Sequence, residues 1–150
     1  MQSIYDDDEL LFNHIVSKVI EQGEPAVNSH GLCEYSIDKD GKTLRCAAGW
    51  AVKDEHLPLM PVCKSIYAAL SSVPEVEAYL GTTFKRRGML QQLQRAHDSA
   101  AFDARQYNAE GDEVSMDRPY FLAEFTRKAR AYQRMEHPTW RWKHGDVPAA

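Results

Sequence analysis

Apolar residues recur at helical spacing near the start of the chain. The stripe consists of residues four positions apart: Leu11, Ile15 and Val19. The acidic segment Asp6–Glu9 precedes this stripe, and negative side chains are favourable in the first turn of a helix. Gly23 follows, at a position where glycine commonly ends a helix. The pattern therefore predicts an amphipathic helix over residues 7–22.

The periodicity changes after this helix. Residues 32–37 alternate between two faces, which is typical of a strand, and the turn residues 38–41 (Asp-Lys-Asp-Gly) follow them. Residues 42–46 then return as a second strand, so the segment predicts a β-hairpin. The small apolar segment Ala47–Val52 predicts a short buried helix, in which Gly49 permits close packing against a neighbour.

The middle of the chain predicts further helices. Three prolines between residues 58 and 74 interrupt regular structure and leave short helices at about 62–71 and 74–80. A longer helix is predicted over residues 84–101. Its apolar stripe includes Leu90, Leu93 and His97.

The last third of the chain predicts a loop and one more helix. The polar segment 103–116 is expected to be a mobile loop, and Asp117 fits the N-cap of a helix that ends near residue 134. The apolar stripe of that helix is expected to be Tyr120, Phe121, Phe125 and Ala129. Together the elements predict an α+β fold, with four to five helices packed around a small antiparallel β-hairpin. We expect one globular domain, residues 1–136, and a Trp-containing C-terminal tail, residues 137–150.

Composition narrows the class of protein. The chain has 150 residues, 43% of them apolar and 27% charged, which suits one domain with a sizeable core. No apolar run approaches the roughly 18 residues of a membrane span, and the N-terminal segment is acidic where a signal peptide would be basic. Three cysteines are too few for a disulfide scaffold. We therefore expect a cytoplasmic protein that does not enter a membrane.

Charge is segregated along the chain. Residues 1–40 hold nine acids and two bases, whereas residues 118–150 hold seven bases and three acids. This segregation indicates two oppositely charged faces or a partner that binds only one of the charged regions. Alternatively, the first and last helices lie side by side and compensate each other. The sequence pI is about 5.8, while nucleic-acid-binding domains are usually basic. Direct nucleic-acid binding is therefore not expected.

One pair of residues suggests nucleophilic catalysis. Cys46 begins the predicted helix Ala47–Val52, where the helix dipole lowers a thiol pKa, and His97 is a candidate base. Asp98 or another carboxylate would orient the imidazole, but adjacent side chains on a helix diverge by about 100°, so Asp98 is expected to be poorly placed for this role. Because His97 lies on the apolar stripe, a hydrogen-bonded core histidine is the alternative.

Two segments of the chain carry donors that suit a metal ion, but neither has the ligand spacing of a complete site. Cys33 and Cys46, with His97 or His30, have donors that suit zinc, but the close ligand pairs of structural zinc sites are missing. The segment 38–41 resembles part of a calcium loop, but an alanine stands where the bidentate glutamate would be required. We expect no metal and no cofactor.

Three clusters are candidate partner contacts. They are the acidic residues Asp6, Asp7, Asp8 and Glu9, the basic residues Lys85, Arg86 and Arg87, and the tail residues Trp140, Arg141 and Trp142. Positive charge at a helix start opposes the helix dipole, which hints at a binding role, although a solvated face is the common alternative. Trp and Arg are typical interface anchors, but two indoles equally fit a tail that packs on the core.

Four motifs stand out in the chain. They are Gly31-Leu32-Cys33-Glu34-Tyr35, Leu44-Arg45-Cys46-Ala47-Ala48-Gly49, Asp54-Glu55 and Leu93-Gln94-Arg95-Ala96-His97-Asp98. In this combination the chain resembles a set of small uncharacterised proteins of bacteriophages and proteobacterial genomes, which share a C-x-Y hairpin, a C-A-x-G turn and an L-Q-x-x-H-D run. The resemblance covers about residues 8–132 and implies a phage or mobile-element origin. Small accessory proteins of that kind often bind host machinery, including defence systems.

The sequence therefore predicts a non-catalytic, phage-type accessory protein. We expect it to bind and inhibit or modulate a host protein or protein–nucleic-acid complex, such as a defence or CRISPR-type system. An acidic surface of the chain could also mimic the charge of nucleic acid toward such a complex. The alternative is a thiol-dependent hydrolase, or a small-ligand (nucleotide) binder, centred on Cys46, His97 and Tyr35.

Overall fold

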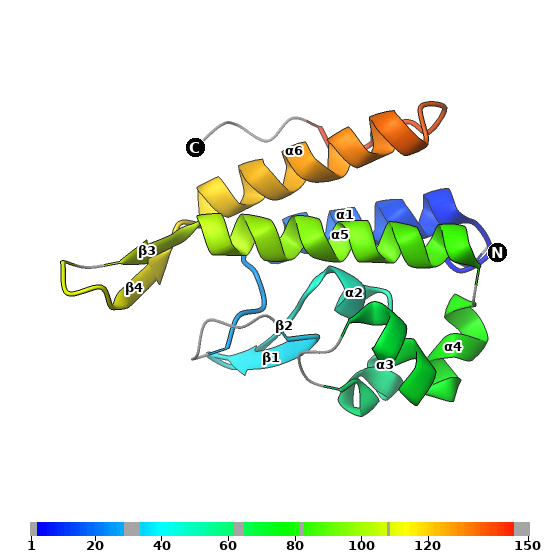
Figure 1. The fold of residues 1–150 in the computed structure, drawn as a ribbon, viewed down its shortest axis with the longest axis horizontal. Coiled ribbons are helices and arrows are strands. Elements are labelled where there is room, and N and C mark those ends of the chain that lie inside the picture. The colour runs from blue at the N-terminus through cyan, green and yellow to red at the C-terminus, as the bar shows by residue number, and fades with distance from the viewer. Residues whose placement is uncertain (1–2, 29–33, 62–64, 82, 108, 146–150) are drawn as a thin grey trace.

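Three long helices, α1, α5 and α6, form one layer of the molecule in Figure 1. The computed structural model describes residues 3–28, 34–61, 65–81, 83–107 and 109–145. The elements in chain order are α1 (Asp8–Gln22), β1 (Ser36–Lys39), β2 (Lys42–Arg45), α2 (Ala47–Trp50), the 3-10 helix η1 (Asp54–Leu59), α3 (Ile66–Ser72), α4 (Pro74–Leu80), α5 (Phe84–Asp103), β3 (Arg105–Tyr107), β4 (Glu113–Met116) and α6 (Arg118–Glu136). The predicted α+β class is confirmed, with six α-helices in the described part of the chain.

Helix α6 packs against both α5 and α1, and the short helix α2 packs against α1 and α5 from the other side. The largest fully buried side chains include Phe12 of α1 and the aromatic pair Phe121 and Phe125 of α6. The two aromatic rings of α6 stack with centroids 6.1 Å apart. None of the helices in the described segments is long and apolar enough to span a membrane.

The first helix forms as the sequence predicts. Asp7 is its N-cap and accepts a hydrogen bond from the Glu9 amide at 3.0 Å. Gly23 ends the helix in the left-handed region with φ 82°, and its amide donates to the carbonyl of Val19. These two caps satisfy backbone groups that the helix itself leaves unpaired, which fixes its length.

The predicted hairpin is also confirmed within the described residues. β1 and β2 pair antiparallel through a turn in which Asp40 (φ 51°) and Gly41 (φ 78°) are both left-handed, as a tight hairpin turn requires. Asp38 accepts a hydrogen bond from the Thr43 hydroxyl at 3.0 Å, so its carboxylate links the two strands of the hairpin. The beginning of the predicted first strand, including Cys33, lies outside the described residues.

Gly49 explains how α2 fits beneath the sheet. A Cβ atom at this position would lie 2.2 Å from the carbonyl oxygen of Tyr35. That carbonyl accepts the Cys46 amide at 3.3 Å and therefore joins the start of α2 to the hairpin. The expected close approach at Gly49 is confirmed, because a side chain there would collide with the backbone.

The segment 103–116 corrects the sequence analysis. It is a second antiparallel hairpin, β3–β4, with a register irregularity between Gln106 and Tyr107, and not an irregular loop. The hairpin extends beyond the ends of α5 and α6 (Figure 1), so neither face carries the apolar pattern of a buried strand. Tyr120 was also placed wrongly, because it is 37% exposed and lies outside the buried stripe of α6.

Candidate functional site

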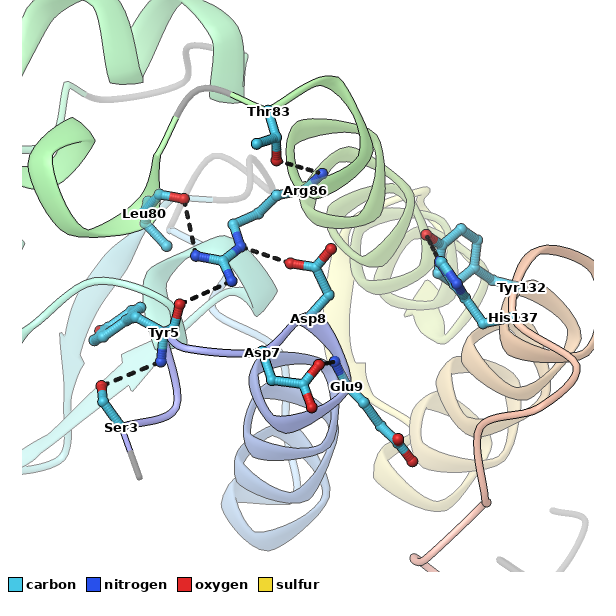
Figure 2. A network of polar contacts seen from close by, with 10 residues as sticks. All are labelled: Ser3, Tyr5, Asp7, Asp8, Glu9, Leu80, Thr83, Arg86, Tyr132 and His137. Carbon is cyan, nitrogen blue, oxygen red and sulfur yellow. Dashed lines mark hydrogen bonds and ion pairs between the residues drawn. The ribbon is translucent and has the colours of Figure 1, made fainter. Parts of the chain in front are cut away.

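The three clusters predicted as partner contacts meet at one end of the molecule. The starts of α1 and α5 and the end of α6 lie together there (Figures 1 and 2). The acidic cluster therefore contacts both other clusters, and the ion pair of Glu24 with Arg118 compensates part of the segregated charge within the molecule. Of the two interpretations of that segregation, the structure supports the one in which the first and last helices lie side by side.

Arg86 is the centre of this end (Figure 2). Its Nε donates to the Asp8 carboxylate at 2.7 Å, and its two terminal nitrogens donate to the carbonyls of Leu80 at 3.1 Å and Tyr5 at 2.9 Å. The Arg86 side chain is 11% exposed and that of Asp8 is 30% exposed. The guanidinium thus joins α1, α4 and α5 and has little surface left for a partner.

The two sequence neighbours of Arg86 differ in their surroundings. Arg87 pairs with Glu77 of α4 at 3.6 Å, whereas Lys85 is exposed. These cations are unfavourable beside the positive end of the α5 dipole. The Thr83 hydroxyl, which caps the helix, and the carboxylates that face the start of α5 offset this effect. Of the basic cluster, only Lys85 is exposed and so available to contact a partner.

The tail packs on α1 as far as it is described. The rings of Trp140 and Trp142 lie with centroids 5.5 and 6.5 Å from that of Phe12. The Arg141 amide donates to the Glu9 carboxylate at 3.3 Å, and the Arg141 side chain stays exposed. The two indoles therefore hold the tail on the core, which was one of the two sequence interpretations.

Cys46 is buried and held in the core. Its Sγ caps α2 by accepting the Gly49 amide at 3.4 Å. Burial is the largest influence on the thiol and raises its pKa to about 12. The expectation that the start of a helix would activate this thiol is wrong, because desolvation of a thiolate outweighs the dipole of a helix of only four residues.

His97 has no solvent exposure, and its two ring nitrogens are both engaged. Nε2 accepts the Ala26 amide at 3.3 Å, so the ring proton lies on Nδ1, which donates to Asp98 at 2.9 Å. The prediction that Asp98 is poorly placed to orient His97 is wrong, because Nδ1 is the ring nitrogen nearest the backbone and is within reach of a short neighbouring side chain. The alternative of a hydrogen-bonded core histidine is confirmed.

A network extends from His97 toward α2. Gln94 donates to Asp98 at 2.7 Å and accepts the Ala48 amide at 2.8 Å. Tyr35 lies nearby, and burial raises the pKa of its phenol well above the usual range. Tyr35, Cys46 and His97 therefore lie in one region of the protein. The hydrogen bonds of this region have a structural role, because they hold α2 and the segment before β1 against α5.

The burial and raised pKa of Cys46 predict that its thiol is unreactive in the folded protein. With a pKa of about 12, only roughly one thiol in ten thousand is ionised near pH 8, and the sulfur is enclosed. We expect iodoacetamide to leave Cys46 unmodified in the folded protein and to alkylate it readily in urea, as read by peptide mass mapping. Rapid alkylation of Cys46 in the native protein would contradict this assignment.

A cleft of about 790 Å³ lies elsewhere, between the first hairpin and β4. It is lined in part by Glu24, whose carboxylate pairs with Lys39 at 3.1 Å and Arg118 at 3.3 Å. Neither Cys46 nor His97 lines this cleft, so the predicted ligand centre and the observed cavity do not coincide. Within the described segments, no group of three His, Cys, Asp or Glu residues could hold a metal, while Cys33 and His30 lie outside those segments.

The sequence analysis missed a set of exposed aromatic side chains at the opposite end of the bundle. We call it the hairpin end, and it comprises Phe102, Tyr107 and Tyr120. They are 65%, 54% and 37% exposed, and the guanidinium of Arg105 lies 5.2 Å from the Phe102 ring centroid. The signal in the sequence was the occurrence of large aromatics within and beside a polar segment. Comparison with protein-family models, curated proteins and solved structures finds no match to the chain.

Proposed function

We propose that the chain is a non-catalytic accessory protein that binds a host protein complex and inhibits or modulates it. The proposal includes the phage-type origin that the sequence motifs imply and a location in the host cytoplasm. The observation that supports it most is the hairpin end, where three exposed aromatic side chains lie on or next in sequence to the acidic hairpin β3–β4, which extends beyond the bundle (Figure 1). Large exposed aromatics beside an arginine are the usual anchors of protein interfaces.

The charge of the hairpin end indicates what kind of surface it would contact. Residues 103–117 contain five acidic residues and one basic residue, a net charge of −4. Asp103, Glu110 and Asp112 are exposed. A basic protein surface complements this arrangement, and the surfaces of nucleic-acid-processing complexes are commonly basic. The predicted mimicry of nucleic-acid charge by an acidic surface is better supported at the hairpin end than at the acidic start of α1, because Asp8 is paired within the molecule.

The thiol-hydrolase alternative receives less support. A buried sulfur with a pKa near 12 is a poor nucleophile, and both nitrogens of His97 are already engaged. A base must have a free lone pair directed at the proton that it removes. The Cys46–His97 region therefore supports a structural role.

Affinity purification tests the proposal. The immobilised wild-type chain should retain a partner from a proteobacterial host lysate at near-stoichiometric amounts. Because both tyrosines are exposed, the double variant Tyr107→Ser/Tyr120→Ser should fold normally but lose about 30-fold or more in affinity for that partner. Retention should also weaken as salt is raised, since exposed charges are screened.

The matched control is Met135→Ser, which removes an apolar side chain that is 79% exposed at the opposite end of α6. This variant should retain the partner like the wild type. Lys85→Glu tests the remaining surface cation of the basic cluster in the same way. Recovery of no partner, or equal retention by the double-tyrosine variant and the wild type, would contradict the proposal.

A further inference from the structure

We propose that the cleft beside β1 binds an extended segment of a partner protein, in which apolar and basic residues alternate, as an added strand. The cleft has a volume of about 790 Å³ and lies between the first hairpin and β4. The whole of β1, Ser36–Lys39, lines it. The aromatic residues of the hairpin end do not line the cleft, so this site does not depend on the function proposed above.

One edge of β1 has no strand beside it. The sheet has two strands in the described part of the chain, so β1 pairs only with β2. Lys39 and Lys42 flank the two-residue turn and form the hydrogen-bonded pair that closes a hairpin of this kind. Because backbone groups alternate in direction along a strand, Ile37 also bonds toward β2, whereas the amides and carbonyls of Ser36 and Asp38 point away from β2.

Two hydrogen bonds before β1 follow the same alternation. The carbonyl of Tyr35 accepts the Cys46 amide at 3.3 Å on the side of β2. The amide of Glu34 donates to the carbonyl of Ala26 at 3.2 Å on the opposite side. The chain neighbours of Ala26 line the cleft, so the unpaired edge of β1 faces the cleft. No other backbone hydrogen bond between described residues reaches this edge, which leaves its amides and carbonyls available to an added strand.

The charges of the cleft favour a basic ligand. The Glu24 carboxylate is already paired with Lys39 at 3.1 Å and with Arg118 at 3.3 Å. The carboxylates of Glu34 and Asp38, by contrast, form no ion pair among the residues that the structure describes. These two residues are four positions apart in extended chain, so they lie on the same face. A lysine or arginine on that face of an added strand would compensate them.

The other face of an added strand would meet apolar side chains. Val27, Ile37 and Met116 line the cleft and pack against the core while remaining partly exposed. Ile37 lies between Ser36 and Asp38, so its side chain is on the opposite face of β1 from theirs. Side chains of an extended ligand alternate in the same way, which is why apolar and basic residues should alternate in the segment that binds.

A segment of another protein fits this edge better than a second copy of β1. Antiparallel pairing of two β1 edges about Ser36 would place Glu34 of one chain opposite Asp38 of the other. Like charges directly opposite each other destabilise a sheet. A small polyamine could compensate the carboxylates, but it would leave the backbone groups of the edge and the apolar side chains without a partner.

Titration calorimetry of the full chain tests the proposal. The ligand is a synthetic peptide of about eight residues in which valine alternates with lysine, blocked at both ends, which is long enough to span β1. It should bind saturably and more weakly as salt is raised, whereas the same peptide with glutamate in place of lysine, and spermine, should bind at least about tenfold more weakly. Tyr107→Ser/Tyr120→Ser should bind the peptide like the wild type, which separates this test from that of the proposed function.

Ser36→Pro tests the edge of the strand. Proline is tolerated on the outer side of an edge strand, but its ring removes the Ser36 amide and obstructs an added strand, so peptide binding should weaken about tenfold or more. Thr43→Pro is the matched control. By the same alternation, Thr43 directs its backbone groups to the outer edge of β2, where the Arg45 amide donates to Gln22 at 2.8 Å. This variant should bind the peptide like the wild type, and circular dichroism checks the fold of both.

The double variant Glu34→Gln/Asp38→Asn tests the charge of the cleft. It keeps the size of both side chains and should weaken binding of the lysine peptide about fivefold. Asp40→Asn is its control, because it removes the same charge from the hairpin turn, outside the lining of the cleft. Asparagine also tolerates the left-handed conformation of Asp40, so this variant should bind like the wild type.

Three outcomes would overturn the proposal. They are the absence of saturable binding of the lysine peptide, binding of the glutamate peptide or spermine as tight as that of the lysine peptide, and equal affinities of Ser36→Pro and Thr43→Pro. If the proline variants do not fold, equal affinities of Glu34→Gln/Asp38→Asn and Asp40→Asn would overturn it instead, since these substitutions leave the backbone unchanged.

Discussion

Replacing Gly49 by alanine is expected to lower the free energy of unfolding by about 3 kcal/mol, at the upper end of the usual effect of overpacking. The new Cβ would lie 2.2 Å from the Tyr35 carbonyl oxygen and 3.2 Å from the Cβ of Arg45. The first of these neighbours is backbone and accepts the Cys46 amide, so it cannot move without breaking the joint between hairpin and α2. Urea denaturation measures the change.

The same substitution at Gly88 is the control. Gly88 lies within α5, and a Cβ there would meet nothing within 4 Å. Alanine should therefore stabilise the protein by about 0.5–1 kcal/mol, because it favours helix over the unfolded chain. Opposite signs for the two variants would establish that the contact with Tyr35, and not the loss of glycine as such, is responsible. A Gly49→Ala protein as stable as the wild type would show that α2 is not packed as described.

Replacing Arg86 by methionine is expected to lower the free energy of unfolding by about 3 kcal/mol and the Tm by roughly 6–12 °C. Methionine keeps the apolar stem but leaves the Asp8 carboxylate and the carbonyls of Tyr5 and Leu80 without their donor. We place the effect at the low end for a buried ion pair because the Asp8 side chain is 30% exposed. Thermal unfolding followed by circular dichroism measures the shift.

Lys85→Met is the control for Arg86→Met. Lys85 is adjacent in sequence and exposed, so its replacement should change stability by less than about 0.5 kcal/mol. If both variants unfold at the same temperature as the wild type, the network in Figure 2 does not stabilise the fold.

The sequence predicted those elements whose signals are local. The acidic start of α1 within Asp6–Glu9, its end at Gly23, the hairpin turn within residues 38–41 and the N-cap Asp117 of α6 are all found where the pattern placed them. The second hairpin was missed because period-2 alternation is visible only when one face of a strand is buried, and β3–β4 extends away from the bundle.

The candidate site was less predictable, because its chemistry depends on contacts between distant segments. Asp8 and Arg86 were both selected as surface contacts, yet their 2.7 Å pairing joins residues that are 78 positions apart. In the same way, the position of Cys46 at a helix start suggested activation, whereas the burial that raises its pKa arises from tertiary packing. Tyr107 was assigned to a loop and Tyr120 to a core stripe, while Phe102 fell between the predicted helix and the predicted loop, so their shared exposure was not visible in the pattern.

The docked tail affects how the protein is made. The Arg141 amide and the Glu9 carboxylate are 132 residues apart, and His144 likewise reaches Asn13 across 131 residues. During synthesis, the face of α1 around Phe12 therefore stays uncovered until residues 140–142 have left the ribosome and Trp140 and Trp142 can pack on it. Contacts between segments so distant in sequence form late, and until they form the apolar face of α1 is open to chaperones.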